Sequence, residues 1–84
     1  MTNLLVIDDD HAVRVDLVDL LETEGFEVLS ALNGRQGVQI ARQSLPDLII
    51  CDIMMPELDG YGVLAELRRD AAATIPFIFL TALA

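Results

Sequence analysis

Four aspartates stand at the ends of two short apolar runs, and they are the residues best suited to chemistry. Residues 4–7 (LLVI) lead directly into Asp8, Asp9 and Asp10, and residues 48–51 (LIIC) lead into Asp52. Carboxylate oxygens are the ligands that a hard divalent cation such as Mg²⁺ prefers. A carboxylate can also act as a nucleophile and form an acyl phosphate. The pattern therefore predicts a cation site at which one aspartate receives a phosphoryl group.

The two apolar runs must lie side by side if these aspartates are to act together. Each run is continuously apolar rather than alternating, which is typical of a parallel strand covered on both faces of a sheet. Similar short runs occur at residues 26–29 and 77–80. We therefore expect four strands, and Glu27 marks the second of them as an exposed edge.

The stretch after the first aspartates has the features of an amphipathic helix. Asp10 is placed to cap its start, and Gly25 is placed to end it in a left-handed conformation. Apolar residues recur at i, i+4, i+7 and i+8, which indicates one helical face. This predicted stripe consists of Val13, Leu17, Leu20 and Leu21.

Two further helices are predicted between the later runs. Asn33-Gly34 opens the second helix and Pro46 stops it. Its expected apolar contacts are Val38, Ile40, Ala41 and Leu45. Asp59 can cap a third helix over residues 60–69, followed by a loop at residues 70–74. The inward-facing residues of this third helix are expected to be Val63, Leu64 and Leu67.

Strands that alternate with helices predict an α/β protein with a parallel sheet and right-handed crossovers. We expect a single domain over residues 1–84, with a flavodoxin-like doubly wound sheet in the strand order 2-1-3-4. In such a sheet the ligand lies beyond the carboxyl ends of the strands, where the strand order reverses. That point falls between the first and third strands, where Asp8, Asp9 and Asp52 stand.

The composition restricts the class of partner. The chain has 14 acidic residues against five arginines, no lysine, and a net charge of −9. Nucleic-acid binding needs clustered basic side chains, so we do not expect it from this segment. No apolar run approaches the roughly 18–20 residues of a membrane span, and the start of the chain lacks a basic signal region. The single Cys51 fits a reducing compartment, so we expect a cytoplasmic protein.

Three segments resemble the strand segments of a response-regulator receiver domain, the phosphoacceptor module of two-component signalling. They are LLVIDDDH, LPDLIICDIMMPELDGYGVL and IPFIFLTALA. The resemblance implies that Asp52 is the phosphoacceptor, and that Asp8, Asp9 and Asp52 hold Mg²⁺ with the backbone carbonyl of Met54. It also implies that Thr81 is the switch hydroxyl. The phosphoryl donor would be a sensor histidine kinase or a phosphotransfer protein. The module would not be an enzyme in its own right, although the family assists its own phosphorylation and dephosphorylation.

The sequence departs from the family pattern at its carboxyl end. Receivers usually continue into a fifth strand ending in a Lys-Pro pair, and into two further helices. We therefore expect residues 1–84 to be the N-terminal two-thirds of a receiver domain. Without the site lysine the phosphoryl group would be poorly neutralised, so Asp52 should phosphorylate poorly even where Mg²⁺ binds. Residues 77–80 carry no charge to protect an edge, so we expect self-association through this strand.

Two other functions stay open at this point. The missing lysine favours a pseudo-receiver that acts only as a protein-interaction or dimerisation unit. The D-x-D arrangement of residues 8–10 also occurs in Mg²⁺-dependent phosphatases, although the chain is short for such an enzyme. Trapping an aspartyl phosphate would separate a receiver from a pseudo-receiver, and turnover of a phosphate ester would identify a phosphatase.

Overall fold

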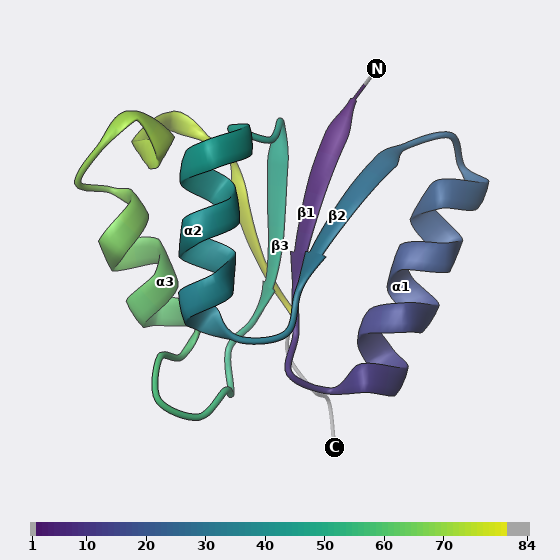
Figure 1. Cartoon of the computed structure of the whole chain (residues 1–84), viewed down its shortest axis with the longest axis horizontal. Coiled ribbons are helices and arrows are strands. Elements are labelled where there is room, and N and C mark those ends of the chain that lie inside the picture. Colours follow the sequence, from purple (N-terminus) through teal and green to yellow (C-terminus); the bar gives the residue numbers. More distant parts are fainter. Residues whose placement is uncertain (1, 81–84) are drawn as a thin grey trace.

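The computed structural model describes residues 2–80, which form one parallel sheet of four strands (Figure 1). The strands are β1 (Asn3–Ile7), β2 (Glu27–Ala31), β3 (Leu48–Asp52) and β4 (Phe77–Leu80). They lie in the order β2-β1-β3-β4, and each neighbouring pair is parallel. The predicted α/β class, flavodoxin-like topology and strand order 2-1-3-4 are confirmed.

Helices cover both faces of the sheet. α1 (His11–Thr23) lies on one face, while α2 (Gly34–Ser44), α3 (Gly60–Leu67) and the short 3₁₀ helix η1 (Ala71–Thr74) lie on the other (Figure 1). In Figure 1 the loops that lead from β1, β2 and β3 into the following helices all lie at the lower edge of the sheet. Within residues 2–80, no helix combines the length and the apolar character that crossing a membrane requires.

The central strands are buried on both faces, as their continuous apolar sequence predicts. From Leu4 to Ile7, no side chain of β1 is more than 3% exposed. The larger part of the core lies between the sheet and the layer formed by α2, α3 and η1. Its members are Leu5, Ile7, Ala31, Val38, Ala41, Ile49, Cys51, Met55, Val63, Leu67 and Ala72. Burial of each large aliphatic side chain contributes about 1.5–3 kcal/mol, so this packing holds β1 firmly against β3.

Each α-helix begins where a short polar side chain caps it. The Asp10 carboxylate accepts a hydrogen bond from the Val13 amide at 3.1 Å, which confirms the predicted cap of α1. In the same way, Asn33 caps α2 and Asp59 caps α3. Each cap fixes the residue at which the preceding strand–helix loop ends.

Only two of the four residues predicted for the buried face of α1 are partly buried. Leu17 and Leu21 are partly buried, but Val13 is 46% exposed and Leu20 is 59% exposed. The half-buried positions of α1 are Arg14, Leu17, Val18 and Leu21. This set also follows the helical period, so apolar spacing alone could not tell which flank of the helix would turn to the sheet. No side chain of α1 is fully buried.

The position of β2 and the role of Leu45 also differ from the prediction. β2 covers Glu27–Ala31 rather than residues 26–29. Phe26 stays outside the strand because its amide donates to the Leu21 carbonyl at 3.2 Å and closes the end of α1. Gly25 adopts a φ of 93° there, as its predicted role requires. Leu45, which was expected to be an apolar contact, is 51% exposed and ends α2 in a left-handed conformation.

The third helix is shorter than predicted. α3 ends at Leu67, and Asp70 caps the 3₁₀ helix η1 in the stretch that was expected to be a loop. The Asp70 carboxylate accepts from the Ala72 amide at 3.0 Å and from Nε of Arg42 at 2.6 Å. These two contacts hold the pKa of Asp70 below its usual value. They favour a new turn at residue 70 over continuation of α3.

We expect Gly60→Ala to destabilise the protein and to disturb the end of β3. A Cβ atom at Gly60 would lie 2.5 Å from the carbonyl oxygen of Asp52 and 3.0 Å from Cα of Ile53. Both are backbone atoms, so the loop itself must move, and such overpacking costs roughly 1–3 kcal/mol. Urea denaturation should show a loss of that size in the free energy of unfolding.

Gly62→Ala, in the same turn of α3, is the matched control. The atom nearest to a Cβ at Gly62 is Cδ1 of Leu58 at 2.5 Å, the far end of a flexible side chain. Alanine also favours the helix over glycine by about 1 kcal/mol. Gly62→Ala should therefore cost much less stability, and equal losses would contradict the role assigned to Gly60.

Candidate metal centre

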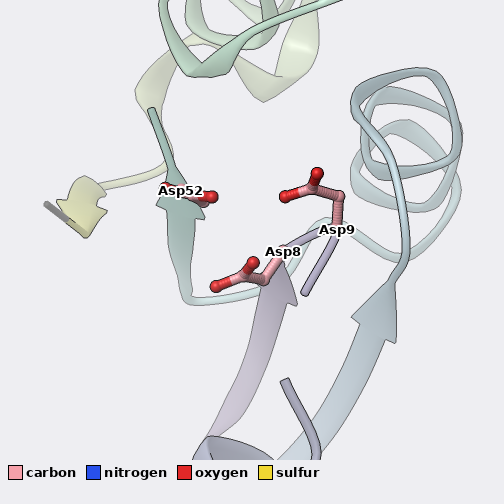
Figure 2. A group of neighbouring side chains, drawn as sticks. All are labelled: Asp8, Asp9 and Asp52. Atoms are coloured by element: carbon pink, nitrogen blue, oxygen red, sulfur yellow. The ribbon is translucent and has the colours of Figure 1, made fainter. Parts of the chain in front are cut away.

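Three carboxylates converge at the carboxyl edge of the sheet. Ile7 pairs with Cys51 in the parallel register, so the residues that follow them, Asp8 and Asp52, leave neighbouring strands at the same level. One carboxylate oxygen from each of Asp8, Asp9 and Asp52 lies within 4.8 Å of the other two. Figure 2 shows the three side chains gathered around the ends of β1 and β3. The predicted convergence of these three residues is confirmed.

Asp8 is the most buried and most firmly held residue of this cluster. Its side chain is only 3% exposed, and it is the one buried charged residue in the described part of the chain. Its amide donates to the Ala31 carbonyl of β2 at 3.1 Å, and its Oδ1 accepts from the Asp10 amide at 2.9 Å. Burial is the main cause that raises the pKa of Asp8, against the lowering effect of the Asp10 amide. The charges of Asp52, Asp9 and Asp10 raise this pKa further.

Asp52 lies at the end of β3, next to the buried thiol of Cys51. Asp52 is partly buried, and the Met54 amide lies 3.4 Å from its Oδ1. Its neighbour Cys51 is fully buried, which raises the pKa of the thiol to about 12, with a smaller contribution from the charge of Asp52. A thiol with such a pKa stays protonated at neutral pH and is a poor nucleophile. Cys51 is therefore a core residue.

The loop from β3 to α3 is held close to the end of β3. The Gly60 amide donates to the Ile53 carbonyl at 2.9 Å, so the loop returns to the strand it left. At its tip Glu57 has a φ of 68°, a conformation that costs a residue with a side chain of order 1 kcal/mol. The Met54 side chain is 79% exposed. Participation of the Met54 carbonyl stays a prediction, and Thr81 lies outside the described residues.

The donor set fits a hard divalent cation. Carboxylates this close repel one another, and a cation placed between them removes that conflict. Mg²⁺ is commonly held by one or two carboxylates and keeps several waters. Asp8 is buried whereas Asp9 is exposed, so the cluster offers both a fixed ligand and access for water. Asp10 does not belong to the cluster, because its carboxylate caps α1.

Sequence reasoning missed Arg14. Its Nη1 donates to the backbone carbonyl of Asp8 at 2.8 Å, and its Nη2 lies 3.1 Å from Nδ1 of His11. The only signal in the sequence is that Arg14 stands four residues after the cap Asp10, one turn into the helix. That spacing does not indicate that the side chain turns back toward the sheet edge.

The sequence matches a known family over nearly its whole length. A profile of the response regulator receiver domain matches residues 4–84. The chain is 45% identical over 80 residues to the probable transcriptional regulator ycf27 of Porphyra purpurea, covering 95% of this chain and 32% of that protein. It is 47% identical over 85 residues to the DNA-binding dual master transcriptional regulator RpaA of Synechocystis sp., covering 99% of this chain and 35% of that protein. The chain thus spans about a third of the length of these curated relatives.

Solved structures show the same fold. A response regulator receiver domain protein from Clostridium thermocellum has a TM-score of 0.91 at 32% identity, covering 96% of this chain and 65% of that one. The chemotaxis protein CheY4 of Vibrio cholerae has a TM-score of 0.93 at 28% identity, covering 100% of this chain and 71% of that one.

We expect Asp8→Asn to stabilise the metal-free protein at neutral pH. The pKa of Asp8 is raised in the folded state, so ionised Asp8 costs stability as the pH rises through that pKa. Asparagine removes this charge but keeps the oxygen that accepts from the Asp10 amide. The substitution removes first the cost of burying this charge and second its repulsion by Asp52 and Asp9. Urea denaturation should therefore show a gain in the free energy of unfolding of at least about 1 kcal/mol, the repulsion of two unit charges about 4 Å apart in water.

Added Mg²⁺ should reverse the order of stability. It should raise the unfolding midpoint of the wild type and leave that of Asp8→Asn unchanged, because a ligand that binds only the folded state stabilises it. Asp19→Asn removes the same charge from an exposed position in α1 and should behave like the wild type in the titration. If Asp8→Asn responded to Mg²⁺ as the wild type does, Asp8 would not be a ligand.

Proposed function

The chain belongs to the response regulator receiver domain family, and from this membership we propose that Asp52 accepts a phosphoryl group beside a bound Mg²⁺ ion. Receiver domains are signalling modules of two-component systems. The observation that carries the proposal is the convergence of the Asp8, Asp9 and Asp52 carboxylates at the end of the two central strands. In this proposal these three carboxylates and the Met54 carbonyl hold the ion.

The proposed reaction moves a phosphoryl group from a phosphohistidine to Asp52. A carboxylate oxygen of Asp52 forms a bond to phosphorus while the phosphorus–nitrogen bond breaks. The electron pair of that bond stays on the imidazole of the donor. Bound Mg²⁺ supplies the charge neutralisation that phosphoryl transfer needs. The donor in this proposal is a sensor histidine kinase or a phosphotransfer protein in the cytoplasm.

The protein's own residues orient the acceptor. Asp52 pairs with Leu80 of β4 in the parallel register, and the amide of Met54 faces one oxygen of its carboxylate. Protonated Cys51 does not compete for the phosphoryl group. We assign the switch hydroxyl to Thr81. The chain has no lysine, so neutralisation of the phosphoryl oxygens depends strongly on the cation, and we expect transfer to be slow.

We expect acetyl phosphate with Mg²⁺ to add one phosphoryl group to the protein. Intact mass spectrometry during a long incubation should show a species heavier by one phosphoryl group. The reaction should stop when the Mg²⁺ is chelated, because the carboxylate cluster then repels the anionic donor.

Asp52→Asn is the direct control, since it keeps the size of the side chain and removes the nucleophile. It should take up no phosphoryl group, whereas Asp47→Asn, directly before the same strand, should react like the wild type. Absence of any modification, or equal modification of Asp52→Asn, would contradict the proposal. A wild type that binds Mg²⁺ but is never modified would favour the pseudo-receiver instead.

We also propose that the chain associates with a second copy through β4. In the described part of the chain, β4 is an edge of the sheet and consists of the uncharged residues 77–80. Ile78 is 50% exposed there. An uncharged apolar edge is the kind that pairs with another strand. Because each copy carries a net charge of −9, salt should strengthen this association by screening the repulsion.

Ile78→Lys should therefore weaken self-association. Sedimentation at increasing protein concentration should show dimers of the wild type, more of them at high salt, and mainly monomers of Ile78→Lys. Leu29→Lys places the same charge on the opposite edge strand, at a side chain that is 45% exposed, and should leave association unchanged. A wild type that stays monomeric at all concentrations and salt levels would contradict this proposal.

A further inference from the structure

A single peptide plane joins two of the three carboxylates in the cluster. The carbonyl of Asp8 and the amide of Asp9 belong to the same planar unit, which also contains both Cα atoms. Any rotation of this plane would swing the Asp9 side chain away from Asp8 and Asp52. Asp9 is exposed, and the side-chain hydrogen bonds that the described residues form around the start of α1 do not include it. Its position therefore depends on what holds the plane.

The amino-terminal side of Asp8 is fixed by the sheet. Its amide donates to the Ala31 carbonyl of β2 at 3.1 Å. On the carboxyl-terminal side the strand has ended, and the Asp8 carbonyl instead accepts from Nη1 of Arg14 at 2.8 Å. Arg14 therefore provides the hydrogen bond that fixes the plane between Asp8 and Asp9.

This contact also closes a ring of hydrogen bonds around the start of α1. Asp8 Oδ1 accepts from the Asp10 amide, and the Asp10 carboxylate accepts from the Val13 amide. The Arg14 amide donates to the Asp10 carbonyl at 2.9 Å, and its side chain returns to the Asp8 carbonyl. Each bond in the ring limits the freedom of the loop that carries Asp9.

Packing alone does not fix this loop. No side chain of α1 is fully buried, whereas α2 and α3 each bury several residues. The start of α1 is therefore held to β1 mainly by polar contacts. Arg14 is itself partly buried, so its guanidinium is held in place along the helix.

We propose that Arg14 is a positioning residue of the cation site, which holds the Asp8–Asp9 peptide so that both carboxylates face Asp52. This inference rests on the proposed function, because it assumes that the cluster binds Mg²⁺. Within residues 2–80 Arg14 forms no ion pair with a carboxylate of the cluster, and it acts through the Asp8 carbonyl. Partners of this kind commonly change metal affinity by roughly 10–100-fold when they are removed.

The positive charge of Arg14 and its positioning role predict opposite changes in Mg²⁺ affinity when Arg14 is replaced. As a nearby positive charge Arg14 repels a cation, so its removal would tighten Mg²⁺ binding. As a positioning residue it favours the binding geometry, so its removal weakens Mg²⁺ binding. Calorimetric titration of the 84-residue chain with MgCl₂, well below the unfolding midpoint, measures this sign directly.

Arg14→Met is the main variant, because methionine keeps the apolar stem and removes the donors. We expect its Mg²⁺ affinity to fall roughly ten-fold. Arg14→Lys keeps the charge and one donor, so it should bind Mg²⁺ more tightly than Arg14→Met and less tightly than the wild type. If Arg14→Met does not fold, the Mg²⁺ affinity of Arg14→Lys is compared with that of the wild type, and it should be lower.

Arg69→Met is the matched control. It removes the same charge from an exposed residue after α3 and should leave the affinity unchanged or slightly tighter. A wild type that does not bind Mg²⁺ would overturn the proposed function and this inference together. A wild type that binds, with Arg14→Met or Arg14→Lys binding as tightly or more tightly, would overturn the role of Arg14 alone. A purely structural role would lower the unfolding midpoint and leave the affinity of the folded protein unchanged.

Discussion

The parallel pairing of β1 with β3 is the constraint on which the site depends. It sets Ile7 beside Cys51, so that Asp8 and Asp52 must emerge together at the edge of the sheet. Each buried aliphatic side chain of these strands contributes about 1.5–3 kcal/mol, and several are buried in each strand. Repulsion between two unit charges about 4 Å apart is about 1 kcal/mol in water and about 4 kcal/mol near a protein surface. Core packing therefore outweighs the repulsion, and the sheet presents a concentrated negative charge that a cation can neutralise.

Backbone contacts then give each acid a separate role. Asp10 caps α1 and so leaves the cluster, whereas the buried Asp8 is held from both sides. The loop after β3 turns back and contacts the Asp52 backbone at Gly60. A residue with a Cβ atom does not fit at this position. The strained Glu57 lies in the same loop. The acids are thus placed by a rigid sheet and oriented by short, tightly connected loops.

Much of this could be predicted from the sequence because it depends on local patterns. Continuous apolar runs indicate buried parallel strands, and Asp10 and Asp59 stand where helix caps are favoured. The errors arose where the outcome depends on which surface a neighbour covers. Val13 and Leu20 fit the helical period but lie on an exposed flank, and Leu45 ends its helix rather than packing. The contact of Arg14 with the sheet edge is of the same kind, since a long flexible side chain has many possible partners.

The most direct test of the central claim is a titration of the isotopically labelled protein with Mg²⁺, followed by amide chemical shifts in NMR spectra. Saturable shifts should appear at the amides of residues 8–10 and 52–54, which surround the three carboxylates. The remaining acids, such as Asp16 and Asp19 in α1, should show at most weak changes that salt removes. Saturable binding centred on α1, or no saturable shift at the sheet edge, would contradict the assignment of Asp8, Asp9 and Asp52 as one cation site.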